Sequence, residues 1–538
     1  MLRVIFLFLV TVQNLWANPF APYFDLQEKK IENYYLQTPP FQNPVQQDSH
    51  FNSYELNLNK LEKDLSGIKL DGLENIYKSF QYNSTLNLYE YDFAIGTNWE
   101  NLPYPIIKSI GAQDPKNWIE HFEDKYNASK KLQTIDFIKE LNTVSRSKAY
   151  AGNQLELLKS PYSYQKIIEK IQNSKNHAFM STFLFQCDAG SERLLKTMEK
   201  KIQEGLKIYL IIDSTFTLAD RSCVKKLRNI GVNLGLQGSL GKVFHEKMYV
   251  FDGEYAIVDG HNIVAAQTLS NGSNNLINDT GVGTTGPMVS EIAQRFIYHW
   301  QTLLKKPLPE SILHFYDELK VTNEKFSQDE YLQDALQKKQ GLCRLVTNTP
   351  GGNKSILETY KAYVQNAKSY IFFNMIDLRF EKKLGNSVGI DFLRLVTEKA
   401  NQNPQMRIDM LSNHWKLPTD IALPKGLAAH PTLFSQLITK PGQLILDRPH
   451  LQISKGRKFL SEILHEDNFH WWASAIYVHS KTMMIDNIIT AIGSYNINPT
   501  SENSSYEQTL ICHDENLAQQ MQKSILHDVL NSIPIFIK

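Results

Sequence analysis

The sequence predicts an α/β protein with two pseudo-repeated halves, each built on a mixed sheet, and a mostly helical N-terminal extension. Two observations predict this class. A strand–helix–strand series occurs twice, about 200 residues apart, which indicates an internal duplication. Each series then leads to the same spacing of His, Lys, Asp and Asn. We therefore expect two halves of the same fold, each with one copy of these polar residues.

The strand and helix periodicities are similar in the two series. Compact apolar runs predict the strands, and apolar residues at helical spacing predict the helix between them. The first series comprises Ala178–Phe185, Ser191–Gln203 and Leu206–Ile212, and the second comprises Ser369–Phe373, Ile390–Ala400 and Arg407–Leu411. A strand, a helix and a strand in succession imply a crossover connection and parallel strands.

The domain boundaries follow from changes in composition. Residues 18–140 are rich in Asn, Gln, Tyr and Lys and form the predicted N-terminal accessory region. The halves span 141–330, with its motif at 240–266, and 331–538, with its motif at 474–501. A charged, Gln-rich stretch near 305–340 connects the two halves.

The first 17 residues have the pattern of a secretory signal peptide. Arg3 precedes an apolar run from Val4 to Val10, and Ala17 stands before a polar segment. The apolar run is too short to span a bilayer, which needs about 20 residues. We therefore expect an exported protein, periplasmic or secreted.

The composition excludes several classes of protein. The 538 residues are 42% hydrophobic and 21% charged, which excludes a disordered chain and a multi-span membrane protein. Lys and Arg number 57 against 56 Asp and Glu, so no global field attracts a polyanion, although a local basic groove remains compatible with these counts.

The cysteines are too few for a disulfide scaffold. Export permits disulfides, but four cysteines allow three pairings, and buried thiols are an equal alternative. No Cys-x-x-Cys pair argues for metal or redox chemistry among Cys187, Cys223, Cys343 and Cys512.

The chemistry-bearing residues occur in two copies of His-x-Lys-x4-Asp, each with an Asn 17 residues after the His. Lysine supplies positive charge, Asn supplies neutral donors, and His supplies a nucleophile or proton carrier, so each copy suits an anionic, oxygen-rich group. The candidate catalytic residues are His245, Lys247, Asn262, His479, Lys481 and Asn496.

Strand geometry predicts how each copy gathers these side chains. Residues i and i+2 of a strand share one face, so each His lies beside its Lys. The pairs Asp252-Gly253 and Asp486-Asn487 predict two-residue hairpin turns. Such turns would place His245 opposite Gly260 and His479 opposite Ser494, with each Asn on the same face.

The aspartates at these turns have a different expected role. A carboxylate at a hairpin turn is more often a turn former than a catalyst. We therefore interpret Asp252 and Asp486 as structural residues of the motif.

The duplicated motif resembles that of the phospholipase D superfamily, over roughly residues 150–538. The resemblance implies that the two halves share one active site at their interface. The second copy matches the family pattern down to Gly493-Ser494-Tyr495-Asn496. The first copy departs at Asp259, where the family usually has a small residue, and Thr500 stands where many relatives have Arg.

The resemblance implies a metal-independent mechanism with no cofactor. One histidine attacks phosphorus and the other transfers protons; the family pattern makes His245 the nucleophile and His479 the acid and base, with the reverse assignment left open. Family members also carry a carboxylate downstream of each motif that hydrogen-bonds the histidine. Asp279 and Glu507 match this histidine-orienting role.

The resemblance therefore implies an exported phospholipase D-type phosphodiesterase or phosphatidyltransferase that acts on glycerophospholipids at a membrane surface. The acceptor is water or an alcohol, and a lipid hydroxyl as acceptor would give cardiolipin. The expected enzyme works as a monomer and needs no nucleic acid. The alternative is an exported, metal-independent nuclease of the same superfamily, for which a contiguous Lys/Arg face would be the distinguishing feature.

Overall fold

A computed structural model describes most of the chain from residue 126 onward. The described residues are 80–83, 88–91, 126–160, 162–214, 221–239, 241–264, 277–376, 380, 387–413, 449–474, 477–530, 532–535 and 537. The predicted signal peptide lies outside them. So does most of the predicted accessory region, apart from the antiparallel pair β1 (Phe80–Asn83) and β2 (Leu88–Tyr91) and the stretch that leads into α7 (Ile135–Ser145).

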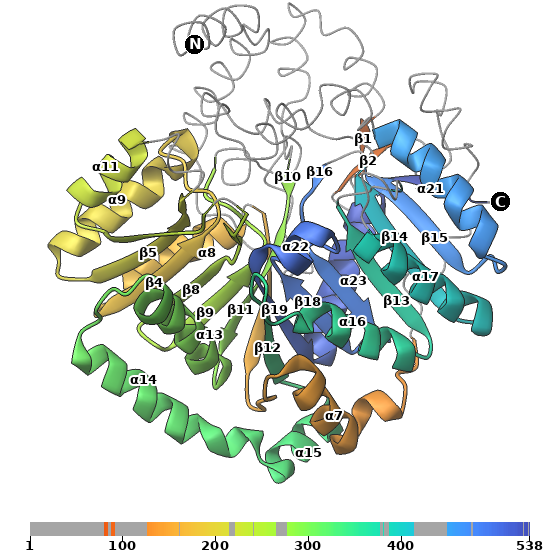
Figure 1. The fold of residues 1–538 in the computed structure, drawn as a ribbon, viewed down its shortest axis with the longest axis horizontal. Coiled ribbons are helices and arrows are strands. Elements are labelled where there is room, and N and C mark those ends of the chain that lie inside the picture. Colours follow the sequence, from red (N-terminus) through yellow and green to blue (C-terminus); the bar gives the residue numbers. More distant parts are fainter. Residues whose placement is uncertain are drawn as a thin grey trace, which may run out of the picture.

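Two mixed sheets form the centre of the molecule (Figure 1). The first has the strand order β3-β11-β9-β8-β4-β5-β6. Its strands are β3 (Gln154–Lys159), β4 (His177–Thr182), β5 (Lys207–Asp213), β6 (Asn233–Gln237), β8 (Met248–Phe251), β9 (Tyr255–Asp259) and β11 (Thr280–Thr285).

The second sheet has the order β12-β19-β18-β17-β13-β14-β15-β20. Its strands are β12 (Leu342–Asn348), β13 (Tyr370–Met375), β14 (Arg407–Asn413), β15 (Phe469–Ser474), β17 (Thr482–Ile485), β18 (Ile489–Gly493), β19 (Ser505–His513) and β20 (Ser532–Ile535). From β3 to β6 and from β12 to β15 the two orders correspond strand for strand, which confirms the predicted pseudo-repeat.

The strand–helix–strand series also form as predicted. Strand β4 is parallel to β5, and β13 is parallel to β14. The connecting helices are α9 (Ala189–Gln203) and α17 (Ser387–Gln402). Helix α9 begins after Asp188, whose side chain accepts a hydrogen bond from Ser191 N at 3.2 Å.

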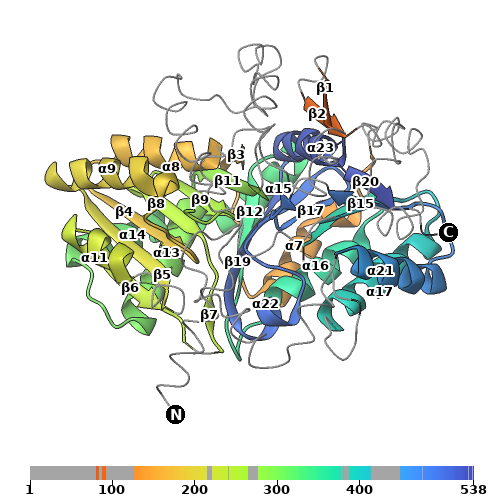
Figure 2. The ribbon, with the colours of Figure 1, turned by 90° about the horizontal axis from the view of Figure 1, so that it is seen from above.

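Helices cover both faces of each sheet (Figure 2). On the first sheet, α8 (Tyr162–Asn173) and α9 lie on one side and α13 (Met288–Ile297) on the other. On the second, α23 (Glu515–Leu530) lies on one side, opposite α16 (Ser355–Asn366), α17 and α21 (Pro449–Ile463). No helix in the described ranges combines the length and apolar character needed to cross a membrane.

One hydrophobic cluster extends across both halves. It joins Phe296 of α13 and Val250 of β8 to Met521 of α23 and Met484 of β17. Because this apolar surface belongs to both sheets at once, the halves are held as one body. The predicted connector is helical: α14 (Glu310–Asn323) packs on α13, and α15 (Asp329–Lys338) packs on α7, both at the bottom of the view in Figure 1.

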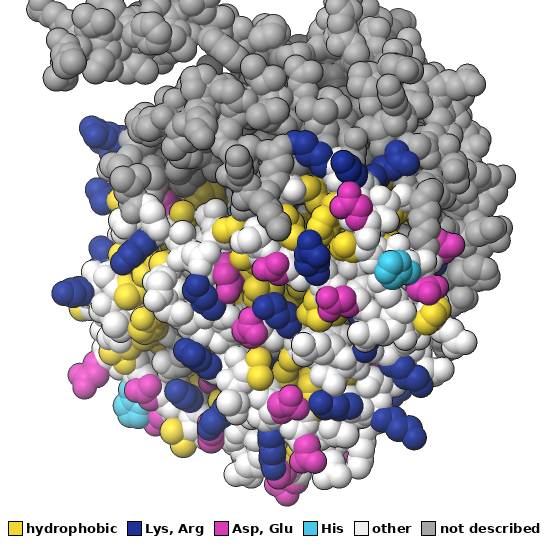
Figure 3. Space-filling view, turned by 45° about the vertical axis from the view of Figure 1, so that its right-hand side comes forward, with side chains coloured by type: hydrophobic (Ala, Val, Ile, Leu, Met, Phe, Trp, Pro, Cys, Tyr) yellow, Lys and Arg dark blue, Asp and Glu magenta, His cyan; other side chains and the backbone are white. Residues whose placement is uncertain are grey.

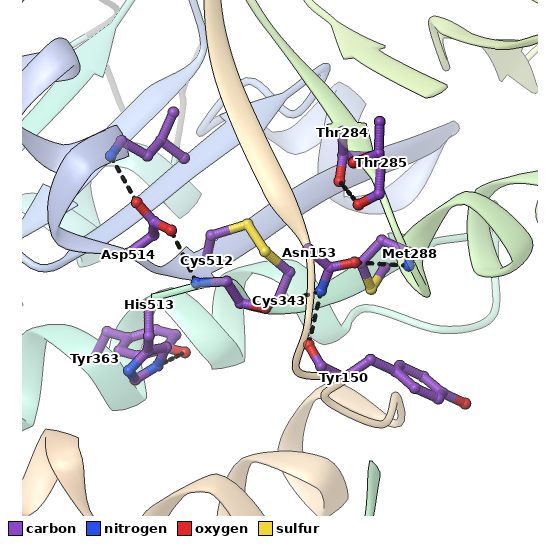
Figure 4. The surroundings of a disulfide bond; sticks show 12 residues. Tyr150, Asn153, Thr284, Thr285, Met288, Cys343, Tyr363, Cys512, His513 and Asp514 are labelled. Carbon is purple, nitrogen blue, oxygen red and sulfur yellow. Dashed lines mark hydrogen bonds between the residues drawn. A yellow bond between two sulfur atoms is a disulfide. The ribbon is translucent and has the colours of Figure 1, made fainter. Parts of the chain in front are cut away.

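The structure pairs all four cysteines, a point that the sequence left open. Cys187 bonds Cys223, and Cys343 bonds Cys512. Cys343 and Cys512 face each other on β12 and β19 at a Cα–Cα distance of 4.1 Å. Both backbone groups of Cys343 bond Tyr150 instead, so the cysteines form a non-hydrogen-bonded pair, where strands approach most closely (Figure 4).

The predicted hairpin register is wrong by one residue in both halves. Phe251 pairs with Tyr255, and Ile485 pairs with Ile489, so each loop has three residues. The turn residues themselves are as expected, with φ of 50° at Asp252 and at Asp486. Glu254 and Ile488 add one residue after each turn, and a one-residue slip exchanges the faces of a strand.

Candidate active site

Two short strand pairings between the halves bring the predicted histidines together. Strand β7 (Val243–Phe244) of the first half runs parallel to the start of β19, and His245 N donates to Tyr506 O at 3.1 Å. In the same way β16 (Tyr477–Val478) runs parallel to β10 (Ile277–Asn278), and His479 N donates to Asn278 O at 2.7 Å. Each half therefore presents its histidine on the backbone of the other half.

The two orienting carboxylates cross between the halves. Glu507 of the second half accepts from His245 Nδ1 at 3.0 Å. Asp279 of the first half accepts from His479 Nδ1 at 2.6 Å. The carboxylate downstream of each motif thus bonds the histidine of the other motif. With Nδ1 engaged, Nε2 is the nitrogen of each ring that can act on a substrate.

The small residues of the motifs serve the opposite histidine as well. A Cβ atom on Gly260 would come within 2.1 Å of Asp279 Oδ1, so only glycine lets the Asp279 carboxylate reach His479. The Ser494 hydroxyl donates to Glu507 Oε2, the oxygen that binds His245. The expectation that His245 lies opposite Gly260, and His479 opposite Ser494, is therefore wrong. The extra turn residue puts Lys247 opposite Asp259 and Lys481 opposite Gly493.

Both lysines are buried beside their histidines. Lys247 Nζ donates to His245 O at 2.7 Å. Lys481 Nζ donates to His479 O and lies 2.8 Å from His479 Nδ1 and 3.0 Å from His479 Nε2. Burial, with a smaller contribution from the neighbouring Lys481, lowers the pKa of Lys247 to about 7. Burial lowers the pKa of Lys481 to about 8. An anion bound between these ammonium groups would favour their charged forms.

The histidines are held in the neutral form. Burial, reinforced by Lys247 and Lys481, lowers the pKa of His245 well below its usual value. Burial and Lys481 lower the pKa of His479 to about 4, against the opposing effect of Asp279. Neutral imidazole is the form that can attack phosphorus.

The two carboxylates differ in charge. Burial tends to raise the pKa of Asp279, but His479 and Lys481 outweigh it, so that pKa lies far below its usual value and Asp279 is ionised. Burial raises the pKa of Glu507 to about 8, against the opposing effect of Lys247. His479 therefore faces a full negative charge, and His245 faces a group that titrates near neutral pH.

The two asparagines follow the strands that carry the motifs. Asn262 is 6% exposed, and its Oδ1 accepts from Leu184 N at 3.1 Å. Asn496 donates its backbone N–H to Ser501 Oγ at 3.2 Å. Their role as donors to a substrate stays a prediction.

The turn aspartates contact the backbone rather than the histidines. Asp252 accepts from the N–H groups of residues 175–177 at 2.7–2.9 Å. Asp486 accepts from Ser129 N and from the N–H groups of residues 368–370, at 2.7–3.2 Å. Each carboxylate thus fixes the start of a central strand, β4 or β13, against the hairpin that carries the Lys.

Sequence reasoning missed a buried carboxylate inside the first motif. Glu246, between His245 and Lys247, is fully buried and binds Arg295 Nε at 3.0 Å and His299 Nε2 at 2.9 Å. The signal that could have found it is a carboxylate between the His and the Lys of the motif, in a segment whose flanking residues are apolar. The second motif has Ser480 at this position, which bonds Thr280 Oγ1 at 2.9 Å.

The chemistry of the assembled groups is suited to a phosphoryl group. Two buried lysines supply positive charge, two neutral histidines supply a nucleophile and a proton carrier, and two carboxylates orient them. Within the described ranges, no group of three or more His, Cys, Asp or Glu side chains is placed to hold a metal ion.

Comparisons with known proteins agree with this class. The family model described as "Cardiolipin synthase, PLD-like domain" matches residues 167–300 and 436–529. Cardiolipin synthase 1 of Staphylococcus epidermidis is 20% identical over 393 residues, 71% of this chain and 69% of that protein. Cardiolipin synthase A of Pseudomonas fluorescens is 22% identical over 433 residues, 78% of this chain and 77% of that protein.

A solved phosphatidylserine synthase from Haemophilus influenzae is 15% identical, with a TM-score of 0.49, and the match covers 74% of this chain and 92% of that one. In both halves the chain is thus similar to members of the phospholipase D superfamily. Each half carries one copy of the superfamily motif, so a single polypeptide contains two copies.

Proposed function

We propose that this phospholipase D-like enzyme transfers a phosphatidyl group between glycerophospholipids in an exported compartment. The donor is phosphatidylglycerol and the acceptor is the hydroxyl of a second phosphatidylglycerol, so the products are cardiolipin and glycerol. The names of the sequence relatives support this reaction. The crossed pairing of two histidine–lysine pairs with two buried carboxylates is the observation that carries the proposal.

The first step forms a covalent intermediate. His245 Nε2 attacks phosphorus, the bond from phosphorus to the glycerol oxygen breaks, and His479 gives that oxygen its proton. Lys247 and Lys481 stabilise the charge on the non-bridging oxygens. His479 receives its proton before this step, and the anionic phosphodiester beside it favours the protonated ring.

The second step returns the enzyme to its starting state. His479, now neutral, takes the proton of the acceptor hydroxyl, and the acceptor oxygen attacks phosphorus as the bond to His245 Nε2 breaks. Water in place of the lipid hydroxyl would give phosphatidic acid. Splitting the displacement into two steps at one site lets a single proton carrier serve both.

The unequal carboxylates support this division of labour. The ionised Asp279 stabilises a positive His479, as a general acid requires. His245 faces Glu507, whose pKa of about 8 means less negative charge, so His245 stays neutral as a nucleophile requires.

The two disulfides support export. Disulfides persist in oxidising compartments, and the Cys343–Cys512 pair is buried, with both residues at most 1% exposed. Because both histidine–lysine pairs and both carboxylates come from one chain, a single copy contains the whole site, which supports function as a monomer at a membrane surface.

The charge on one face of the molecule gives no support to the nuclease alternative. On the face in Figure 3, Lys and Arg side chains lie among Asp and Glu over the described surface and do not gather into one basic band. We therefore keep the nuclease only as an outcome of the test.

The test incubates the full chain with vesicles of phosphatidylglycerol and phosphatidylethanolamine and measures lipids by mass spectrometry. His245→Ala and His479→Ala should each abolish cardiolipin formation while the far-UV circular dichroism stays unchanged. His314→Ala is the matched control, because His314 is an exposed residue of α14.

Cardiolipin that forms with the wild type and the control alone would support the proposal. If phosphatidic acid forms in place of cardiolipin, the acceptor is water and not a lipid hydroxyl. An unchanged lipid profile from folded wild-type protein, together with cleavage of added DNA, would overturn the lipid substrate in favour of nucleic acid.

A further inference from the structure

The first half departs from the second at the residues that hold the orienting carboxylate. In the second half, Ser494 and Ser501 donate hydroxyl hydrogen bonds to Glu507. In the first half the position of Ser494 is Gly260, which has no hydroxyl and leaves no room for one beside Asp279. Asp279 Oδ1 instead accepts from Thr280 N at 2.9 Å, and other residues fix the backbone of Asp279.

A buried chain of three side chains ends on Asp279. Asp259 Oδ1 accepts from His261 Nδ1, and His261 Nε2 hydrogen-bonds Ser160 Oγ. Ser160 Oγ accepts from Asp279 N at 3.1 Å, and Ser160 N donates to Asp279 O at 3.1 Å. The serine thus holds Asp279 on both sides of its backbone.

Asp259, at the other end of this series of side chains, is also held by hydrogen bonds. Asp259 Oδ1 also accepts from His261 N at 3.0 Å, and Ser163 Oγ donates to Oδ2. Asp259 is fully buried, and His261 and Ser160 are 2% and 8% exposed. Gly281, opposite Asp259 on β11, makes room for this carboxylate, because a Cβ atom there would come within 2.7 Å of Asp259 Oδ1.

We propose that Asp259, His261 and Ser160 are positioning residues, which hold Asp279 so that its carboxylate fixes the ring of His479. This inference rests on the proposed function, in which His479 is the acid and base. The inference also explains why the first motif has Asp259 where the family usually has a small residue. The Asp259 carboxylate holds the hydrogen-bonded side chains that act in place of a hydroxyl at Gly260.

The order of residue types is that of a hydrolytic Asp–His–Ser triad, but the contacts here differ. Ser160 Oγ already accepts a backbone N–H from Asp279, so the chain ends at Asp279. The charged groups that face His261 are Asp259, Asp279 and Lys159. Both carboxylates favour a protonated His261, and together they raise its pKa despite its burial and Lys159.

A substrate-free measurement tests the inference. In full-length protein labelled with ¹⁵N-histidine, the ring signals of His479 are assigned by their loss in His479→Gln. Since Asp279 is ionised and can only accept, wild-type His479 should carry its proton on Nδ1. Ser160→Ala should give a mixture of the two tautomers, and Ser160→Thr, which keeps the hydroxyl, should restore the wild-type signals.

The matched control is Ser290→Ala. Ser290 is also a buried serine, with hydrogen bonds to Pro287 O and Asn323, but it lies on α13 and contacts none of the site residues described above. Its loss should leave the His479 signals unchanged. If Ser160→Ala fails to fold, His261→Gln gives the same test from the next link of the chain.

Kinetics supply the second readout. Ser160→Ala should lower kcat about tenfold with little change in KM, because a misplaced proton carrier slows chemistry rather than binding. In an Asp279→Asn background the same substitution should have almost no further effect, since the chain acts through that carboxylate.

The outcomes separate the two proposals. Unchanged His479 signals in folded Ser160→Ala and His261→Gln would overturn the inference, whether or not lipid transfer occurs. Altered His479 signals in a protein without transferase activity would support the positioning chain and overturn the proposed function instead.

Discussion

At the residue scale, the proposal gives the two histidines different roles, and a substrate with a good leaving group can distinguish these roles. A p-nitrophenyl phosphodiester releases its alcohol without help from an acid, so His479→Ala should still form the intermediate but fail to resolve it. We expect a burst of p-nitrophenol close to one equivalent per enzyme, followed by very slow turnover.

His245→Ala should give no burst, because it lacks the attacking nitrogen. Stopped-flow absorbance is the measurement, with His314→Ala as the control. A burst in His245→Ala and none in His479→Ala would reverse the assignment of nucleophile and acid.

The lysines predict a pH dependence of substrate binding. With pKa values of about 7 for Lys247 and about 8 for Lys481, both side chains are charged at pH 6 and mostly neutral at pH 9. An anionic phosphodiester should therefore bind less tightly as pH rises through this range, and KM should increase several-fold.

Initial rates at fixed ionic strength, measured from pH 6 to pH 9, check this expectation. Lys200→Met removes an exposed lysine and should leave the pH profile unchanged. A KM that stays constant from pH 6 to pH 9 would mean that the lysines keep their charge throughout.

The sequence predicted the histidines and the lysines of the site, because these residue types recur at fixed spacing, and the family resemblance indicated the two carboxylates. It did not predict which carboxylate serves which histidine. That depends on strand pairs such as β7 with β19, which join residues 262 apart in the chain, and no local period encodes such a pairing.

At the element scale, the aspartates of the hairpin turns stabilise the fold. Asp486→Ala should lower the free energy of unfolding by about 3 kcal/mol, because a charged acceptor of several backbone N–H groups is lost. The folded fraction should keep its kcat within about twofold, since Asp486 contacts backbone far from the reacting atoms.

Urea unfolding followed by fluorescence measures this loss. Asp334→Ala, which removes an exposed carboxylate of α15, should cost little. If Asp486→Ala lowers kcat as much as His479→Ala does, the turn aspartate takes part in catalysis.

The elements themselves were largely predictable, because each strand–helix–strand series carries a clear apolar period. The hairpin register was not. Asp252-Gly253 specifies the turn, but the added residue Glu254 lies in a position that no turn preference marks, and the shift changes every cross-strand neighbour of the motif.

At the scale of the whole molecule, the disulfides close loops of very different length. Cys343 and Cys512 are separated by 169 residues, and Cys187 and Cys223 by 36. Loop-closure entropy then predicts a stabilisation of about 5 kcal/mol for the longer loop and about 4 kcal/mol for the shorter.

Paired substitutions to Ala in each disulfide test this order. Thermal unfolding should show a lower Tm for Cys343→Ala/Cys512→Ala than for Cys187→Ala/Cys223→Ala, and dithiothreitol should lower the Tm of the wild type. Equal Tm values with and without the reductant would mean that neither bond forms in solution.

The crossed carboxylates also limit how such a chain can recombine. A hybrid gene that joins the first half of this protein to the second half of a relative would keep each histidine beside its own lysine. In the hybrid, however, His245 would bind a carboxylate of the relative, and Asp279 would bind a histidine of the relative. The two halves of the coding sequence are therefore expected to be inherited as one unit.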